Sequence, residues 1–243
     1  MYRSGFANRL IFNEVSMFRS VLACCVLALS LAAHAGLLDQ VSQTDMTTGL
    51  KDSLQQGAIS AISKLGQENG FFNNAKVKIP LPKPMQQAEK LMRTFGMKKQ
   101  ADDLVLSMNR AAEAAVPEAK ALFVGAVKTM SAPDAYGILK GGEDSATQYF
   151  RKTTEDPLRG RFLPIVVKAI EKVGLAQQYN AVAGKAAKLG LIKGTDTNVE
   201  NYVTQKALDG LYVMMADEEK AIRANPVKAS TDIAKKIFDL LRK

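Results

Sequence analysis

The chain has 243 residues, and its 33 Lys and Arg outnumber its 24 Asp and Glu, which gives a formal charge of +9. Its two cysteines, Cys24 and Cys25, and its single histidine, His34, all lie in the first 35 residues. If that segment is removed after export, the remaining chain has no residue for a disulfide, a thiol nucleophile, a Ser-His-Asp triad or a zinc site built from His or Cys.

The first 35 residues have the pattern of a secretory signal peptide. An apolar run, Val21–Leu31, follows Arg19 and precedes Ala33-His34-Ala35, which matches the small-x-small cleavage pattern. We therefore expect the mature protein to begin at Gly36 and to reside in the periplasm. The apolar run is shorter than the roughly 20 residues that a membrane span needs, and no second such run follows, so no transmembrane span is predicted.

Two details of this segment concern its start and its processing. Met17 is the more natural start of such a signal, because residues 1–16 contain Glu14 and no apolar block, so these residues are interpreted as an overextended start. Val21-Leu22-Ala23-Cys24 resembles a lipoprotein cleavage box. Cleavage before Cys24 would leave hardly any apolar segment upstream, and we therefore favour soluble release over a lipoprotein.

The charges of the remaining chain are interspersed. Loss of residues 1–35 removes three arginines and Glu14 and leaves a formal charge of +7. Short basic pairs such as Lys98-Lys99 and Lys235-Lys236 are separated by acidic residues. This pattern indicates a solvated surface with a weak attraction to anionic envelope components, and it lacks the clustered basic face that nucleic-acid binding needs.

The first predicted helix runs from about Thr47 to Leu65, where apolar residues recur at spacings of three and four, and Gly66 ends it. Lys76–Pro84 differs in kind, because apolar residues alternate there with lysines and prolines. Prolines at positions 80, 82 and 84 exclude a helix and a central strand, so we expect a short extended Pro-rich arm or an edge strand. The arm either straps the first helix to the other helices or pairs with a partner.

Helical spacing resumes at about Met85, and a continuous apolar stripe with many alanines follows over residues 101–116. Asn109 lies at the edge of this stripe, and Arg110 and Glu113 lie outside it. We interpret these three residues as surface or interface polar groups.

The middle of the chain is predicted to hold several shorter helices. One is expected over Glu118–Met130, and Ser131 caps a short helix after it. Asp144 or Ser145 caps the next helix, which carries Arg151. A further helix begins at Asp156-Pro157 and is kinked or divided by Pro164. The pair Gly141-Gly142 precedes one of these helix starts. It is interpreted either as an ordinary turn or as an anion site built from unpaired amide groups.

Asn198–Pro226 has the longest helical pattern in the chain. Thr197 and Glu200 have the spacing of a capping box, and Asn225-Pro226 ends the pattern. Its apolar arc is too wide for a helix on the surface, so a central helix packed on two sides is predicted.

Glu218 interrupts this arc between Met214 and Ile222. A carboxylate at such a position must be paired, protonated or lining a cavity. The interpretations are a structural ion pair with an arginine such as Arg110, a helix whose burial ends early, or a functional carboxylate. The candidate polar cluster comprises Asn109, Arg110, Glu113, Arg151 and Glu218.

Two further helices are predicted over Ala176–Leu189 and after Ser230, and no parallel-sheet pattern or fixed-period repeat is present. We therefore predict one all-α, bundle-like domain of about eight to ten helices over residues 36–243, with the Pro-rich arm as its extended segment.

Several short clusters occur together in this chain. They are Ile79-Pro80-Leu81-Pro82, Leu106–Glu113 with Pro117-Glu118-Ala119, Gly141-Gly142 with Tyr149-Phe150-Arg151, Ala207–Leu211, and Glu218-Glu219 with Ile222-Arg223 and Asn225-Pro226. In combination they resemble a bacterial family of exported helical proteins, the domain-of-unknown-function family 4197, over nearly all of the mature chain. The resemblance implies an envelope location and a single domain. It carries no activity, cofactor or catalytic residue.

The favoured function is a non-enzymatic periplasmic protein that binds another envelope protein or an apolar small molecule, because the sequence offers no recognisable catalytic apparatus. Four methionines could line an adaptable cavity or simply belong to the core, namely Met108, Met130, Met214 and Met215.

The alternative is a carboxylate enzyme that acts on cell-wall glycan, with Glu218 or Glu219 as a lone general acid. The absence of Trp from the sequence weighs against it, because aromatic side chains are what stack on sugars. No metal or cofactor is predicted.

Overall fold

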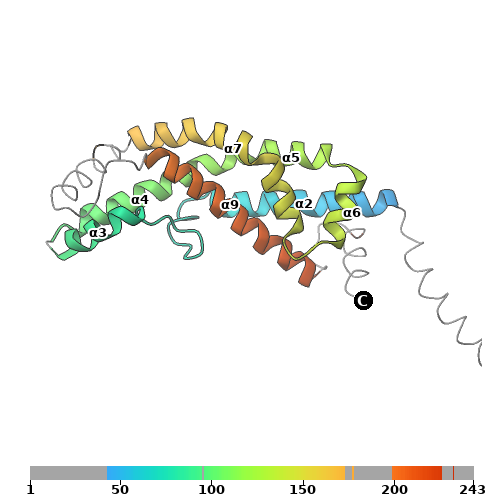
Figure 1. Ribbon diagram of the computed structural model, residues 1–243, viewed down its shortest axis with the longest axis horizontal. Coiled ribbons are helices and arrows are strands. Elements are labelled where there is room, and N and C mark those ends of the chain that lie inside the picture. Colours follow the sequence, from blue (N-terminus) through green and yellow to red (C-terminus); the bar gives the residue numbers. More distant parts are fainter. Residues whose placement is uncertain (1–42, 95, 173–176, 178–198, 226–231, 233–243) are drawn as a thin grey trace, which may run out of the picture. The chain divides into compact units, whose positions relative to one another are not determined.

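The computed structural model describes residues 43–94, 96–172, 177, 199–225 and 232 (Figure 1). The chain separates into two compact units, residues 1–46 and 47–243. Only residues 43–46 of the first unit are described, so the signal peptide predicted over residues 1–35 lies outside the described residues. The fold below is that of the second unit.

All regular structure in the described ranges is helical, which confirms the all-α prediction. The elements are α2 (Gln43–Leu65), α3 (Lys83–Thr94), α4 (Lys98–Ala115), the 3₁₀ helix η1 (Val116–Glu118), α5 (Ala119–Thr129), α6 (Ala132–Lys140), α7 (Ser145–Lys172) and α9 (Val199–Ala224). These seven α-helices are fewer than the eight to ten predicted. The helices predicted over Ala176–Leu189 and after Ser230 fall outside the described residues, and no described helix is long and apolar enough to cross a membrane.

Helix α7 is the clearest departure from the prediction. It runs through both Pro157 and Pro164, so the helix boundary predicted at Asp156-Pro157 is wrong. A proline in a helix removes one hydrogen bond and bends the axis, and Figure 1 shows that α7 changes direction along its length. Leu158 and Phe162 are fully buried next to the prolines, so packing holds the turns on both sides and the helix bends without ending.

Helix α9 has the central position that its wide apolar arc predicts. It packs against α7 and α4, and α4 in turn packs against α7. Three aromatic rings fill the space between these helices and α5. Phe123 of α5 meets Phe150 of α7 edge-on at 5.3 Å between centroids, and it meets Tyr212 of α9 edge-on at 6.3 Å.

The arm, defined here as residues 71–82 between α2 and α3, consists of turns followed by chain without helix or strand. Its apolar side chains Phe71, Val77, Ile79 and Leu81 are buried, so the arm belongs to the core. Lys83 already starts α3, and the predicted segment Lys76–Pro84 is therefore two residues too long at its end.

The arm also presses on α9 at Gly210. A Cβ atom at this position would lie 2.6 Å from Cε1 of Phe71 and 3.2 Å from Cβ of Val77. Real Cβ atoms essentially never show contacts as short as 2.6 Å, and 3.2 Å is tighter than most of them. Glycine, normally unfavourable inside a helix, is therefore required here by the close approach of the arm.

Candidate functional site

Two groups of buried and partly buried polar side chains join helices to segments that are distant in sequence. The arm clamp is formed by Asn109, Arg110 and Glu113 of α4. The helix-start clamp is formed by Glu219 and Arg223 of α9. We describe each from its hydrogen bonds and then ask what it can do.

Asn109 holds the arm at one residue. Its side chain is fully buried, and its Oδ1 accepts a hydrogen bond of 2.8 Å from the Ile79 amide. Its Nδ2 donates to the Ile79 carbonyl at 2.9 Å and to the Val105 carbonyl at 2.7 Å. A carboxamide both donates and accepts, so it serves the two backbone groups of an extended residue that has no neighbouring strand.

Glu113 holds the arm at its beginning. The side chain is buried, and Oε1 accepts hydrogen bonds from the amides of Phe71 and Phe72 at 3.0 and 3.1 Å. Its other oxygen is paired with Arg110, one turn earlier on α4. Both oxygens of this buried carboxylate are thus engaged.

Arg110 connects the same clamp to the turn that follows α2. Its Nη2 donates to Oε1 of Glu68 at 3.0 Å and to Oδ1 of Asn69 at 2.9 Å. Asn69 has a φ of 67°, the left-handed conformation that asparagine tolerates better than most residues. The guanidinium therefore fixes a tight turn at the start of the arm.

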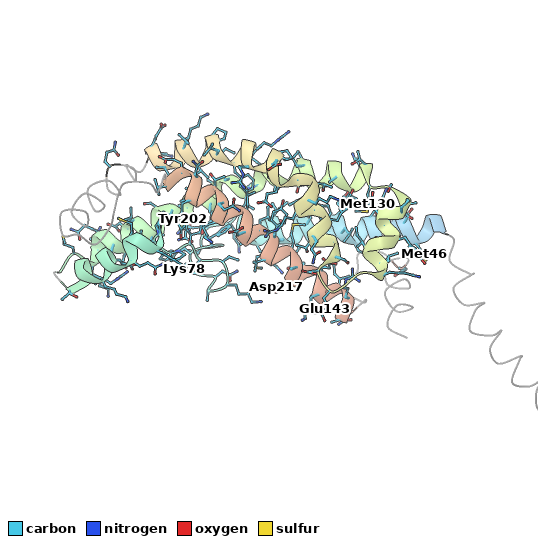
Figure 2. The ribbon with its side chains drawn as sticks, in the orientation of Figure 1. Met46, Lys78, Met130, Glu143, Tyr202 and Asp217 are labelled. Carbon is cyan, nitrogen blue, oxygen red and sulfur yellow. The ribbon has the colours of Figure 1, made fainter. Side chains whose placement is uncertain are left out.

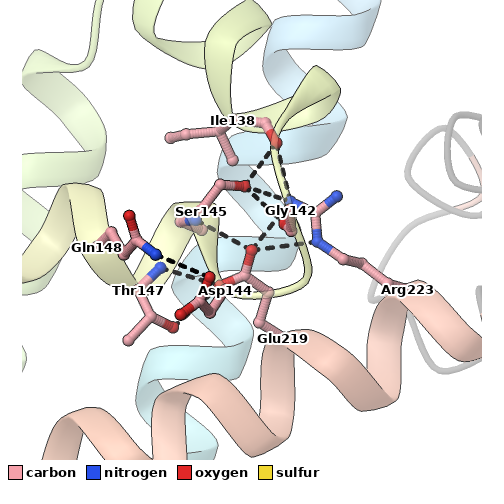
Figure 3. A network of polar contacts seen from close by, with 9 residues as sticks. Ile138, Gly142, Asp144, Ser145, Thr147, Gln148, Glu219 and Arg223 are labelled. Atoms are coloured by element: carbon pink, nitrogen blue, oxygen red, sulfur yellow. Dashed lines mark hydrogen bonds and ion pairs between the residues drawn. The ribbon is translucent and has the colours of Figure 1, made fainter.

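Glu219 caps the first turn of α7 (Figure 3). Its Oε1 accepts from the Ala146 amide at 2.9 Å, and its Oε2 accepts from the amide and the hydroxyl of Thr147, each at 2.9 Å. The first amides of a helix have no partner within the helix, and the helix dipole favours a negative charge there. The anion that could sit after Gly141-Gly142 is therefore supplied by the chain itself.

Arg223 completes this clamp one turn after Glu219. Its Nε and Nη2 donate to Oε1 of Glu219 at 3.1 and 2.9 Å. The same Nη2 reaches the Ile138 carbonyl and the Ser145 hydroxyl, both at 2.8 Å. A Cβ atom at Gly141 would lie 2.5 Å from Cβ of Ser145, so this glycine lets the chain turn close to the clamp.

Glu218 lies outside both clamps. It is paired with Lys64 of α2, and its side chain is 18% exposed. The ion pair predicted between Glu218 and Arg110 does not form, because Arg110 is bonded to Glu113, Glu68 and Asn69 instead.

Arg151 is also separate from the arm clamp. Its guanidinium lies 4.7 Å from the centroid of the Tyr212 ring, and its Nη1 is 3.9 Å from Oδ1 of Asp209. The structure therefore brings together Asn109, Arg110 and Glu113, and it places Arg151 and Glu218 elsewhere.

The role of Arg223, and the pairing of Glu219 with α7, were missed from the sequence. A local signal for them exists. Met215 lies four residues before Glu219 and Ile222 three residues after it, which puts this carboxylate on an apolar face, and Arg223 has the i,i+4 spacing of an ion pair.

The chemistry open to these clamps is limited by their bonding. Both buried carboxylates accept hydrogen bonds from backbone amides and from an arginine, so all four of their oxygens are engaged within the fold. Among the described residues, no group of three or more potential metal ligands occurs. The one buried side-chain N or O atom without a partner in the described ranges is Oγ1 of Thr204.

Tyr212 of α9, like the clamp residues, joins two helices through a buried hydrogen bond, here to α7. Its hydroxyl lies 2.9 Å from Oγ1 of Thr154, and Oγ1 of Thr154 also donates to the Phe150 carbonyl at 2.6 Å. Burial raises the pKa of Tyr212 to about 12.

Three cavities lie on or near these elements. One of about 20 Å³ beside Glu219 and Met215 has room for about one water molecule. A shallow depression of about 520 Å³ lies over Pro117–Lys128 alone. The third, called the arm cleft here, has about 370 Å³ and lies between the arm, α3 and α4.

The four methionines considered as a cavity lining are all buried, namely Met108, Met130, Met214 and Met215. Met215 lines the smallest of the three cavities, which is too small for an organic ligand.

Comparison with known proteins identifies a family. The family described as "Protein of unknown function (DUF4197)" matches residues 40–239, a range that includes every described residue. The chain belongs to the DUF4197 family. The comparisons found no matching curated protein and no matching solved structure. Both clamps and the arm cleft therefore lie within the DUF4197 domain.

Proposed function

We propose that this DUF4197 protein is an exported, non-catalytic binding protein of the bacterial envelope. One observation carries the proposal: of the two carboxylates considered as a general acid, the more buried one, Glu219, is bonded to two amides, a hydroxyl and a guanidinium of its own chain. A general acid or base must reach the proton it transfers. Glu219 reaches only groups that hold the fold together.

The sequence supplies the location in this proposal. The apolar run before Ala33-His34-Ala35 supports export through a cleavable signal, with Gly36 as the first residue of the mature chain. The role assigned to the helical domain there is to bind a small molecule or another envelope protein.

The test compares activity and binding on the mature protein purified from the periplasm without detergent. Incubation with purified cell wall should release no soluble glycan fragments. The proposal fails if wild type releases fragments and a folded Glu218→Gln or Glu219→Gln variant does not. Glu218→Gln is the more telling variant, because Glu218 is partly exposed and its change leaves the helix-start clamp in place.

Native mass spectrometry of the same sample examines the binding role. A mass that exceeds that of residues 36–243 by a constant, dissociable increment would identify a bound small molecule. The bare mass would direct the search to a protein partner by crosslinking in cells. The same spectrum reports whether the chain begins at Gly36.

A further inference from the structure

The arm cleft has the volume of a small-molecule site. Its volume of about 370 Å³ lies in the range of about 300–1,000 Å³ that ligand pockets occupy. Three elements line it: Phe72, Ala75, Lys78 and Pro80 from the arm, Glu89 and Arg93 from α3, and Asp102 and Val105 from α4. The depression over Pro117–Lys128, in contrast, is lined by one continuous segment.

The charges that line the arm cleft are unequally paired. Arg93 holds both carboxylates, with Nη2 at 2.8 Å from Oε1 of Glu89 and 2.7 Å from Oδ1 of Asp102. Lys78 has no carboxylate partner in the part of the chain that the structure describes, and its Nζ lies 4.1 Å from the centroid of the Phe72 ring. The two cations and two carboxylates of the lining balance in number, and Lys78, labelled in Figure 2, is the lining cation that no carboxylate of the described residues engages; it lies beside the Phe72 ring.

The arm clamp fixes the residues that line this cleft. Asn109 binds both backbone groups of Ile79, between Lys78 and Pro80. Glu113 binds the Phe72 amide. A wall held in place before binding spares the ligand the cost of ordering it. The clamp therefore does more than stabilise the fold, because it fixes the backbone next to Lys78.

We propose that the arm cleft binds a small amphipathic monoanion, with the anionic group on Lys78 and the apolar body against Phe72, Pro80 and Val105. This site deepens the proposed binding function and rests on it. The ligand class follows from Lys78, the lining cation without a carboxylate partner among the described residues, and from the apolar side chains beside it.

The probe for this proposal is 1-anilinonaphthalene-8-sulfonate, which joins an aromatic body to one sulfonate and fluoresces in apolar sites. Titration of the mature wild-type protein should show saturable binding at one site. Lys78→Gln should weaken it about five- to tenfold, the usual size of one charge-assisted contact. Ala75→Phe, which adds a ring to the cleft lining, should abolish it.

Two controls separate this site from general apolar binding. Lys76→Gln is the matched variant, since Lys76 lies two residues away and is paired with Asp217 outside the cleft; its affinity should change less than about twofold. N-phenyl-1-naphthylamine, the same rings without the sulfonate, should bind the wild type more weakly and should not distinguish Lys78→Gln from the wild type. Circular dichroism should show the same helix content for every variant.

The proposal is overturned if wild type shows no saturable binding, if Lys78→Gln and Lys76→Gln bind the sulfonate equally, or if folded Ala75→Phe still binds it. None of these results decides the broader binding function, which is judged by the cell-wall assay and by native mass spectrometry.

Discussion

The arm clamp and the helix-start clamp both supply hydrogen-bond partners to backbone groups, but they use different side chains. Each uses a buried carboxylate, Glu113 or Glu219, to accept hydrogen bonds from two consecutive backbone amides. At a helix start the open amides all point one way, and a carboxylate with its arginine suffices. In the arm a single residue, Ile79, presents both its amide and its carbonyl, and only there does a carboxamide, Asn109, join the carboxylate. The comparison shows that the backbone geometry of the held segment selects the side chain that holds it.

The largest expected effect is at the helix-start clamp. Glu219→Ala should lower the free energy of unfolding by about 3–5 kcal/mol, because Arg223 and two helix amides lose a buried partner. Urea unfolding followed by circular dichroism measures this. The adjacent Glu218→Ala should cost less than about 1 kcal/mol, since its ion pair with Lys64 is largely exposed on the lysine side. Equal losses in the two variants would show that Glu219 is not a special partner of α7.

Changes in the arm clamp should lower the free energy of unfolding slightly less. Asn109→Ala leaves both backbone groups of Ile79 without a partner and should cost about 2–4 kcal/mol in the same urea experiment. Asn109→Asp keeps the acceptor but places a buried carboxylate oxygen against the carbonyls of Ile79 and Val105, so its cost at neutral pH should be at least that of alanine. Asn73→Ala, at an exposed position of the arm, is the control and should stay within about 0.5 kcal/mol of wild type. A loss at Asn73 equal to that at Asn109 would contradict the clamp.

The arm can also be disturbed from its other side. Gly210→Ala places a methyl group against the buried ring of Phe71 and should destabilise the protein by about 1–3 kcal/mol. Gly160→Ala in α7 has no atom within 4 Å of the new Cβ, so it should stabilise the protein by about 0.5–1 kcal/mol. Thermal unfolding of both variants gives opposite shifts if the arm is packed on α9 as described. Two shifts of the same sign would argue against that packing.

The smallest loss of stability is expected from a change at Tyr212, which lies in the contact between α7 and α9. At neutral pH, Tyr212→Phe should cost about 1 kcal/mol, because Thr154 keeps its bond to the Phe150 carbonyl. Burial raises the pKa of Tyr212 from 10 to about 12. The stability that this neutral hydroxyl provides is complete below pH 10, the value for the unfolded chain, and is lost as the pH rises towards 12.

Urea midpoints of wild type and Tyr212→Phe at about pH 9 and pH 11 test this linkage. The fall in stability between the two pH values should be smaller in the variant. An identical fall in both proteins would mean that other groups account for the alkaline loss.

Local signals in the sequence predict the elements of this fold well. Ser131 and Asp134 form the capping box that their spacing indicates, with hydrogen bonds of 3.1 and 3.2 Å between side chains and amides. Helix α9 ends at Ala224, directly before Asn225-Pro226. In both cases the information lies within four residues, because a cap or a proline acts on its own turn.

Contacts between distant segments are what the sequence does not give. Helical spacing separates Glu218 from Glu219 by 100°, yet α9 is buried on several sides, so the periodicity alone cannot say which carboxylate meets a partner. The partner of Glu219 is Ala146, 73 residues away. The helix boundary predicted at Pro157 was wrong for a related reason. The burial of Leu158 and Phe162, which lets α7 continue beyond this proline, depends on helices elsewhere in the chain.

The cap of α7 has a consequence for the order in which the protein can be completed. Ala146 precedes Glu219 by 73 residues, so the chain up to Ala146 is synthesised, and in an exported protein also crosses the membrane, before Glu219 follows. Until then the first turn of α7 has its serine and its glycines but not its carboxylate. Helix α9 therefore finishes a helix made well before it, and a chain truncated before Glu219 would retain the sequence of α7 without the carboxylate that caps its first turn.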